Sequence, residues 1–349
     1  MRPLIIPVFL PFSGCRQQCL FCNQRTNFQK TPTPASVRDF IEASLARIPS
    51  GQAGKTRQVA FYGGSFTAME KADQGRYLKA VQPFLASGAI HSIRVSTRPD
   101  ALEEDILALL RAAGVKTIEV GAQSMIDEVL RLSKRGHCAA DTVSAASRLR
   151  RAGFETGIHL MIGLPGDTLD HFLETLDRLI ELKPDFVRIH PTLVLKGAPI
   201  EDLWRTGRYS PLALEEAVRW LKSGLLKLEA ASIPVARIGL QATQELESDF
   251  LAGPNHPALH QLVDSAVFFD MAKHLLQISP NGSRAIFLCN PKDVSGLRGQ
   301  KNDNLSRLKE QFRLSEILIE EREELPRGSL AKKGDGSIYR FFSSASLSV

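Results

Sequence analysis

The sequence predicts an α/β protein built on a parallel sheet, for three reasons. Short strands rich in β-branched residues alternate with amphipathic helices along most of the 349 residues. The strands are almost continuously apolar, which is typical of a parallel sheet covered on both faces. Glycine follows one helix after another, as at residues 88, 114 and 153. Six or seven strand–helix units, counted from residue 4, would form an open doubly wound sheet or a complete or partial barrel.

The expected strands fix where the functional loops should lie. They span residues 4–10, 58–62, 92–96, 116–120, 155–162, 185–190 and 233–240. In parallel α/β folds, ligands bind in the loops that follow the carboxyl ends of the strands. Every unusual motif of this chain follows one of these strands. We therefore expect the motifs to meet at one rim of the sheet.

The character of the sequence changes near residue 251, where LAGPNHPAL contains two prolines and a glycine. We therefore divide the chain into a core, residues 1–250, and a small α/β C-terminal domain, residues 251–349. Residues 284–322 of this domain read as a strand, a GLRG loop, a helix and a strand. That order is similar to the KH fold, whose GXXG loop clamps a nucleic-acid backbone. A plain packing domain is the alternative.

Composition limits the cellular setting. The net charge of +6 suits an anionic partner such as RNA, but ordinary surface lysines and arginines explain it equally well. Five cysteines, three of them clustered, do not form a disulfide framework and indicate a reducing compartment. Pro3, Pro7 and Pro11 interrupt the N-terminal apolar run that an export signal would need. No segment reaches the roughly 18 apolar residues that span a bilayer. We predict a cytoplasmic protein without a membrane partner.

Three cysteines near the N-terminus form the most informative motif. Cys15, Cys19 and Cys22 are spaced C-x3-C-x2-C, and Phe21 precedes the last of them. A cubane iron–sulfur cluster normally takes four thiolates, and a structural zinc site also takes four ligands. The histidine nearest to this motif in sequence is His91, so no fourth ligand lies close by. The set therefore reads as an open metal site.

This motif, in a loop after the first strand, resembles the signature of the radical S-adenosylmethionine (SAM) superfamily. The resemblance covers roughly residues 5–240. It implies a partial TIM-like (β/α)6-type barrel in which the three thiolates bind three irons of a [4Fe-4S] cluster and SAM chelates the fourth. It further implies reductive cleavage of SAM to a 5′-deoxyadenosyl radical, with an electron donor such as flavodoxin or ferredoxin.

Glycine and polar residues at the same rim resemble SAM-binding positions of this superfamily. FYGGSF resembles the glycine motif that receives the SAM amino group, with serine at the usual acidic position. STRPD, GAQS and KRGH resemble segments that contact the ribose and the carboxylate of SAM. The candidate residues are Gly63, Gly64, Ser65, Ser96, Arg98, Gln123 and Arg135.

Each of these assignments has an ordinary structural alternative. The glycine pair is also compatible with a simple turn, and Asp100 with the N-cap of the following helix. Arg135 could form a surface salt bridge instead. GLPGD, at residues 163–167, resembles a segment near adenine, although a turn leading to Asp167 as an N-cap explains much of it.

The order GAQS, RGH, IGLPGD and PTLVLKG is similar to the radical SAM domain of the catalytic subunit of Elongator and its bacterial relatives. Residues after 250 contain no recognisable acetyl-CoA loop, so tRNA acetylation is not predicted. We expect an RNA substrate, with tRNA preferred, and Arg298 and Lys301 in the RNA-binding tail. His159 and His190 are either core histidines or substrate-facing groups. The alternatives are a radical SAM enzyme for a small metabolite or porphyrin-like anion, and a non-catalytic metal-binding protein.

Overall fold

The computed structural model describes residues 3–15, 17–23, 31–49, 51, 54–241, 243–278, 283–333 and 339–343. The chain divides into two compact units. The first comprises residues 1–211 and 243–253, and the second comprises residues 212–242 and 254–349. The sequence predicted a single boundary near residue 250. In the structure the chain passes from the first unit to the second after residue 211, returns to the first at residue 243, and enters the second again after residue 253.

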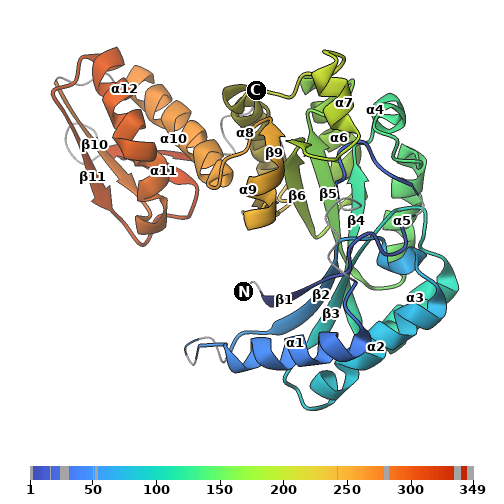
Figure 1. The fold of residues 1–349 in the computed structure, drawn as a ribbon. Helices are drawn as coiled ribbons and strands as arrows, with labels where there is room; N and C mark the ends of the chain where they lie inside the picture. Colours follow the sequence, from blue (N-terminus) through green and yellow to red (C-terminus); the bar gives the residue numbers. More distant parts are fainter. Residues whose placement is uncertain are drawn as a thin grey trace. The chain divides into compact units, whose positions relative to one another are not determined.

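Within its described residues, the first unit carries a parallel sheet in which each strand is hydrogen-bonded to its neighbour in sequence (Figure 1). This order has no switch point, so it rules out the doubly wound sheet and confirms the partial barrel. The strands are β1 (Leu4–Phe9), β2 (Arg57–Tyr62), β3 (Ser92–Thr97), β4 (Val115–Gln123), β5 (Glu155–Ile162) and β6 (Phe186–Pro191).

Helices cover the outer face of this sheet (Figure 1). The longer ones are α1 (Pro34–Ala46), α2 (Lys71–Ala86), α3 (Glu104–Ala112), α5 (Ala139–Arg151) and α6 (Leu169–Leu182). Ile93 and Ile118 of the sheet share one core cluster with Leu78, Leu110 and Leu149 of the helices. Each such burial contributes about 1.5–3 kcal/mol. Because strand side chains alternate between faces, the residues between these apolar positions lie on the inner face.

Shorter elements complete the first unit. Its rim carries η2 (Phe66–Ala68), α4 (Asp127–Leu132), α7 (Ile200–Arg205) and α9 (Gln244–Asp249). β7 (Val194–Leu195) pairs antiparallel with β9 (Phe250–Ala252). None of the helices that the structure describes combines the length and the apolar character needed to cross a membrane.

The second unit contains a sheet in the order β11-β10-β12-β13, in which β10 and β11 are parallel and the other pairs antiparallel. The strands of this sheet are β10 (Arg284–Cys289), β11 (Glu316–Glu321), β12 (Ser329–Lys333) and β13 (Tyr339–Ser343). The unit also contains β8 (Val235–Ile238), which is not part of this sheet. Its helices are α8 (Leu214–Ala230), α10 (Leu259–Ile278), η3 (Pro291–Asp293), α11 (Val294–Arg298), η4 (Gln300–Asn302) and α12 (Asp303–Phe312).

The segment expected to form the GLRG loop is largely helical. Gly296 and Leu297 lie in α11 and are buried, and a Cβ on Gly296 would lie 2.9 Å from the ring of Phe268. Close packing against α10 therefore overrides the turn signal of the glycines. Arg298 and Lys301 are exposed beside the turn at residues 299–302, so only the end of the expected loop is open to solvent.

Candidate functional site

The three clustered cysteines lie on the loop that follows β1. Cys19 is buried, whereas Cys15 and Cys22 are half-buried. The Cys15 N–H donates to the carbonyl of Phe12 at 3.1 Å, and the Cys22 N–H donates to the carbonyl of Cys19 at 3.1 Å. These two tight turns bring the thiols onto one short loop. All five cysteines of the chain are free thiols.

Glycines allow this cysteine loop to pack against the loop after β2. The Ser65 N–H donates to the carbonyl of Ser13 at 2.8 Å. A Cβ on Gly64 would lie 2.2 Å from the Ser13 oxygen, and a Cβ on Gly14 would lie 2.2 Å from the Ser65 oxygen. Gly63 adopts a φ of +97°, which side chains rarely tolerate. The glycines are therefore needed for contact between two backbones at the rim.

Replacing Gly64 by alanine should destabilise the protein, because the new Cβ overlaps backbone that cannot move aside. We expect Gly64→Ala to lower the free energy of unfolding by about 1–3 kcal/mol in chemical denaturation. Gly75→Ala is the matched control, since Gly75 lies inside α2 with open space around it. That control should raise stability by about 0.5–1 kcal/mol. Equal stability of the Gly64→Ala variant and the unmodified chain would contradict the packing described here.

The candidate SAM-binding residues that follow β2 and β3 are joined by hydrogen bonds. Ser65 is 1% exposed, and its hydroxyl accepts the Arg98 N–H at 3.2 Å and contacts the Thr97 hydroxyl at 3.0 Å. Arg98 binds both carboxylate oxygens of Asp100, at 2.8 and 2.7 Å. Its Nη1 also donates to the carbonyl of Arg135 at 2.8 Å. Ser96 is half-buried on the inner face at the end of β3.

The two N-caps considered as alternatives, Asp100 and Asp167, do not form. α3 begins at Glu104 with Glu103 at its N-cap position, and Asp100 is held instead in the ion pair with Arg98. α6 is capped by Thr168, whose hydroxyl accepts the His171 N–H at 3.1 Å. Asp167 accepts the Gly163 N–H at 2.9 Å and so closes the GLPGD turn. Burial raises the pKa of Asp167 to about 7, although these backbone bonds oppose the shift.

Arg135 connects the cysteine loop to the end of β4. Its side chain is buried, which excludes the alternative of a surface salt bridge. Nη1 lies 3.0 Å from the Cys19 sulfur, Nη2 donates to the carbonyl of Gly121 at 2.6 Å, and the guanidinium lies 5.8 Å from the centre of the Phe21 ring. Arg135 therefore places a positive charge directly beside the Cys19 sulfur.

Gln123 lies beside Arg135 in a strained backbone conformation. β4 continues beyond its expected end to Gln123, which has a φ of +69°, and the register with β5 shifts between Val120 and Gln123. A Cβ on Gly121 would lie 3.0 Å from the Gln123 amide nitrogen and 3.5 Å from Arg135 Nη2. Positive φ values outside glycine are uncommon and are concentrated at functional sites.

The thiols and the guanidiniums form one electrostatic group. Burial raises the pKa of the Cys15 thiol, and the neighbouring Cys19 raises it further, while Arg135 and Arg98 lower it. Among the described residues, no three cysteine, histidine, aspartate or glutamate side chains converge as ligands of a single metal ion. A cubane does not need such convergence, because each thiolate binds a different iron. A thiol-only donor set beside two guanidiniums fits an anionic iron–sulfur cluster.

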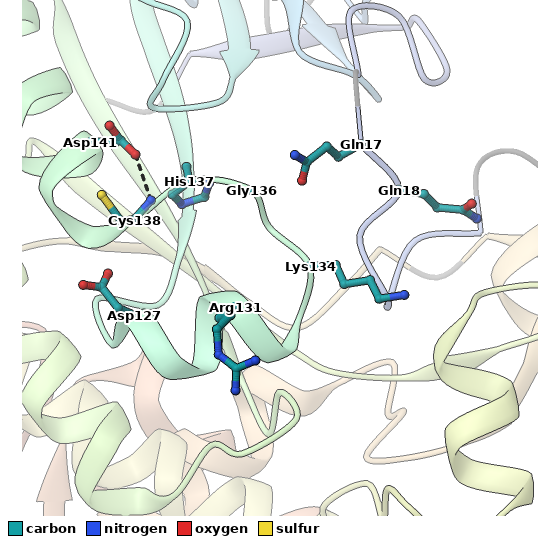
Figure 2. A pocket seen from close by; sticks show the side chains of 9 residues that line it. All are labelled: Gln17, Gln18, Asp127, Arg131, Lys134, Gly136, His137, Cys138 and Asp141. Atoms are coloured by element: carbon teal, nitrogen blue, oxygen red, sulfur yellow. Dashed lines mark hydrogen bonds between the residues drawn. The ribbon is translucent and has the colours of Figure 1, made fainter.

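An open pocket of about 880 Å³ adjoins the cysteine loop. Figure 2 shows Gln17 and Gln18 of that loop across from His137 and Cys138. Gly136, with a φ of +68°, allows Gln17 to approach, since a Cβ there would overlap the Gln17 amide. The sequence expectations did not include the two glutamines, because nothing in their type or spacing marks them.

His137 is a buried neutral histidine in the wall of this pocket. Burial, assisted by the positive charges of Arg135 and Arg98, lowers the pKa of His137 to about 4. Its Nε2 lies 3.2 Å from the carbonyl of Ala122 and therefore carries the proton. Among the described residues no group donates a hydrogen bond to Nδ1, which is left as an acceptor.

This pKa predicts a loss of stability in mild acid. Between the ordinary pKa of 6.5 and the folded pKa of about 4, only the unfolded chain binds the proton. The free energy of unfolding should therefore fall by about 2 kcal/mol between about pH 7.5 and about pH 5 through His137 alone. Chemical denaturation at both pH values measures it. His137→Gln should remove this part of the dependence, whereas His171→Gln, at a half-buried position outside the pocket, should keep it. An unchanged slope in His137→Gln would refute the assignment.

A network of charged side chains lies on the inner face of the half-barrel. Glu119 is fully buried, accepts hydrogen bonds from Arg94 at 2.5 Å and Tyr62 at 3.1 Å, and contacts His159. Arg188 lies 3.5 Å from the same carboxylate. Burial opposes ionisation, but His159, Arg188 and Arg94 together hold the pKa of Glu119 well below its usual range.

These inner residues were mostly missed by the sequence expectations. His159 was considered, and its ring lies 5.7 Å from that of His190. Arg94, Glu119 and Arg188 were read only as parts of the strands SIRVS, KTIEV and DFVRIH. A charged residue in the middle of a buried apolar strand was the available signal, because such a charge must be paired or functional.

Comparison with known families gives two matches along the chain. The model of the radical SAM superfamily matches residues 9–179, which contain the cysteine loop and β2–β5. The model of the radical SAM C-terminal domain matches residues 184–267.

The similar proteins include two different kinds of enzyme. The tRNA uridine(34) acetyltransferase of Methanocaldococcus infernus is 33% identical over 127 residues, which are 36% of this chain and 24% of that protein. The oxygen-independent coproporphyrinogen III oxidase of Escherichia coli is 29% identical over 209 residues, which are 58% of this chain and 45% of that protein. The chain thus spans less than half the length of either relative.

Among solved structures, the fold resembles an N-terminally truncated Elp3 of Methanocaldococcus infernus. The TM-score is 0.58 at 23% identity, over 78% of this chain and 64% of that one. At this identity the likeness concerns the fold alone.

Proposed function

The chain belongs to the radical SAM superfamily of enzymes, and from this premise we propose that it cleaves SAM at a [4Fe-4S] cluster in order to modify RNA, with tRNA preferred. The observation that carries the proposal is the cysteine loop, which places Cys15, Cys19 and Cys22 on one short segment, with the buried guanidinium of Arg135 in contact with the Cys19 sulfur. Cys15, Cys19 and Cys22 would hold the cluster. When bound, the cluster and SAM supply one-electron cleavage of the sulfonium and hydrogen abstraction by the 5′-deoxyadenosyl radical.

The chain's own residues position and shield these groups. Arg98 and Arg135 supply two positive charges beside the thiols, and Arg135 has the planar fork that binds a carboxylate. Gln123 presents an amide next to Arg135. The remaining candidates for SAM binding are Gly63, Gly64, Ser65 and Ser96, which line the rim after β2 and β3.

RNA is preferred as the substrate because the acetyltransferase relatives are named for a tRNA uridine. The net charge of +6 and the exposed Arg298 and Lys301 are compatible with it. The second candidate substrate is a porphyrin-like anion, favoured by the longer match to the coproporphyrinogen oxidase. We further propose a cytoplasmic setting and a flavodoxin or ferredoxin as the electron donor, since a cluster with three thiolates needs a reducing environment.

Anaerobic reconstitution tests the cofactor assignment. We expect four irons per chain and dithionite-dependent formation of 5′-deoxyadenosine from SAM, both lost in Cys19→Ala because one thiolate is removed. Cys138→Ala is the control, since this exposed cysteine lies outside the loop. Bound zinc without SAM cleavage would favour the non-catalytic metal-binding protein instead.

Filter binding tests the RNA substrate separately. Binding of tRNA should weaken steeply with salt, and replacing Arg298 and Lys301 by glutamine should lower both the affinity and the salt slope, because each cation neutralises about one phosphate. Replacing Lys55 and Arg76, in the first unit, provides a charge-matched control. An absence of binding at low salt would remove the RNA proposal and leave the small-anion candidate.

A further inference from the structure

The inner face of the half-barrel holds more positive than negative charge at its centre. Arg94 and Arg188 both approach Glu119, which is the fully buried carboxylate between them. Glu155 lies 3.9 Å from Arg94, at the amino end of β5 and thus away from the rim. Arg188 therefore shares one carboxylate with a second guanidinium.

Arg94 and Arg188 differ in how many good hydrogen bonds their guanidinium groups make. Arg94 makes a bond of 2.5 Å to Glu119 and bonds of 3.1 and 3.0 Å to the Gln58 oxygen. Within the part of the chain that the structure describes, the polar contacts of Arg188 are long, 3.5 Å to Glu119 and 3.4 Å to the Tyr62 hydroxyl. Its buried Nε has no hydrogen-bond partner among the described residues. Good N–H···O bonds measure about 2.7–3.2 Å, and an unpaired buried donor is costly.

The surroundings of Arg188 hold its guanidinium in place. Its central carbon lies 5.6 Å from the centre of the Tyr62 ring, in a cation–π arrangement. Burial, reinforced by Glu119, raises the pKa of Tyr62 to about 12. The hydroxyl therefore keeps its proton and donates a hydrogen bond to Glu119. The neighbours Val187 and Ile189 are fully buried on the other face of β6, which fixes the strand's orientation.

Arg188 can still be reached from the inner face. Its side chain is 20% exposed, compared with 7% for Arg94. Tyr62, His159 and His190 beside it are only partly buried. Tyr62 ends β2, so the network extends from the middle of β6 to the rim where the cysteine loop lies.

We propose that Arg188 is a substrate-binding residue that takes an anionic oxygen group, a phosphate or a carboxylate, on the inner face of the half-barrel. Its planar fork matches both groups, and its two Nη groups, whose contacts with Glu119 and Tyr62 are long, supply the donors that such a pair needs. Glu119 and Tyr62 are positioning residues that hold the guanidinium. The role in substrate binding rests on the proposed function, whereas the anion site itself does not.

Binding of simple anions to the full chain, without iron or SAM, tests the site. The probes are inorganic phosphate and acetate, which represent an RNA backbone and a carboxylate metabolite. In ¹⁵N-labelled protein the Nε–H resonance of Arg188, identified by its loss in Arg188→Lys, should shift and saturate with at least one probe. A stronger response to phosphate assigns the site to phosphate, and a stronger response to acetate assigns it to a carboxylate.

Thermal stabilisation by the same probes provides the affinity. Arg188→Gln should weaken binding at least about tenfold, because a charge-assisted bidentate pair is lost. Arg188→Lys keeps the charge but not the planar fork, so its affinity for the anions should lie between those of Arg188→Gln and the unmodified chain. If Arg188→Gln does not fold, Arg188→Lys alone provides the test. Arg76→Gln, on the exposed side of α2, should match the unmodified chain.

Unchanged anion binding in both Arg188 variants, or an Arg188 resonance that neither probe shifts, would overturn the proposal. Neither outcome depends on SAM cleavage, so failure of the anion site and failure of the proposed function are separable.

Discussion

The buried guanidinium of Arg135 joins the separate loops of the rim. It contacts the sulfur of Cys19 on the loop after β1 and the carbonyl of Gly121 at the end of β4. The carbonyl of the same residue accepts a hydrogen bond from Arg98, on the loop after β3. A buried cation of this kind needs polar partners to be stable. Here Nη1 and Nη2 find them on the loops that would carry the cluster and SAM.

In the half-barrel, polar side chains lie on the inner face of the sheet and the hydrophobic core lies on the outer face, because successive side chains of a strand point to opposite faces. Ile118 and Val120 of β4 point outward into the helices, and Glu119 between them points inward. The apolar residues of the outer face stabilise the fold, so that the inner face can carry polar side chains suited to binding. A shift of one residue in register would exchange the two faces, so the apolar core also fixes the inner network.

Much of the architecture could be predicted because it rests on local patterns. The repeat of strand and helix predicted the parallel sheet, whereas the open metal site inferred from the cysteine spacing stays a prediction. Details set by tertiary contacts could not be read in this way. Asp100 is a good N-cap by type, but its pairing with Arg98 removes it from α3. Gly296 looks like a loop residue, but the ring of Phe268 needs a glycine inside a helix.

The central claim is that three thiolates hold a cluster whose fourth iron is open to SAM. Mössbauer spectroscopy of the chain reconstituted with ⁵⁷Fe tests it most directly, because the method distinguishes the individual iron sites. Addition of SAM should change the isomer shift of one iron in four and leave the other three unchanged. A spectrum in which SAM changes none of the irons would contradict the account.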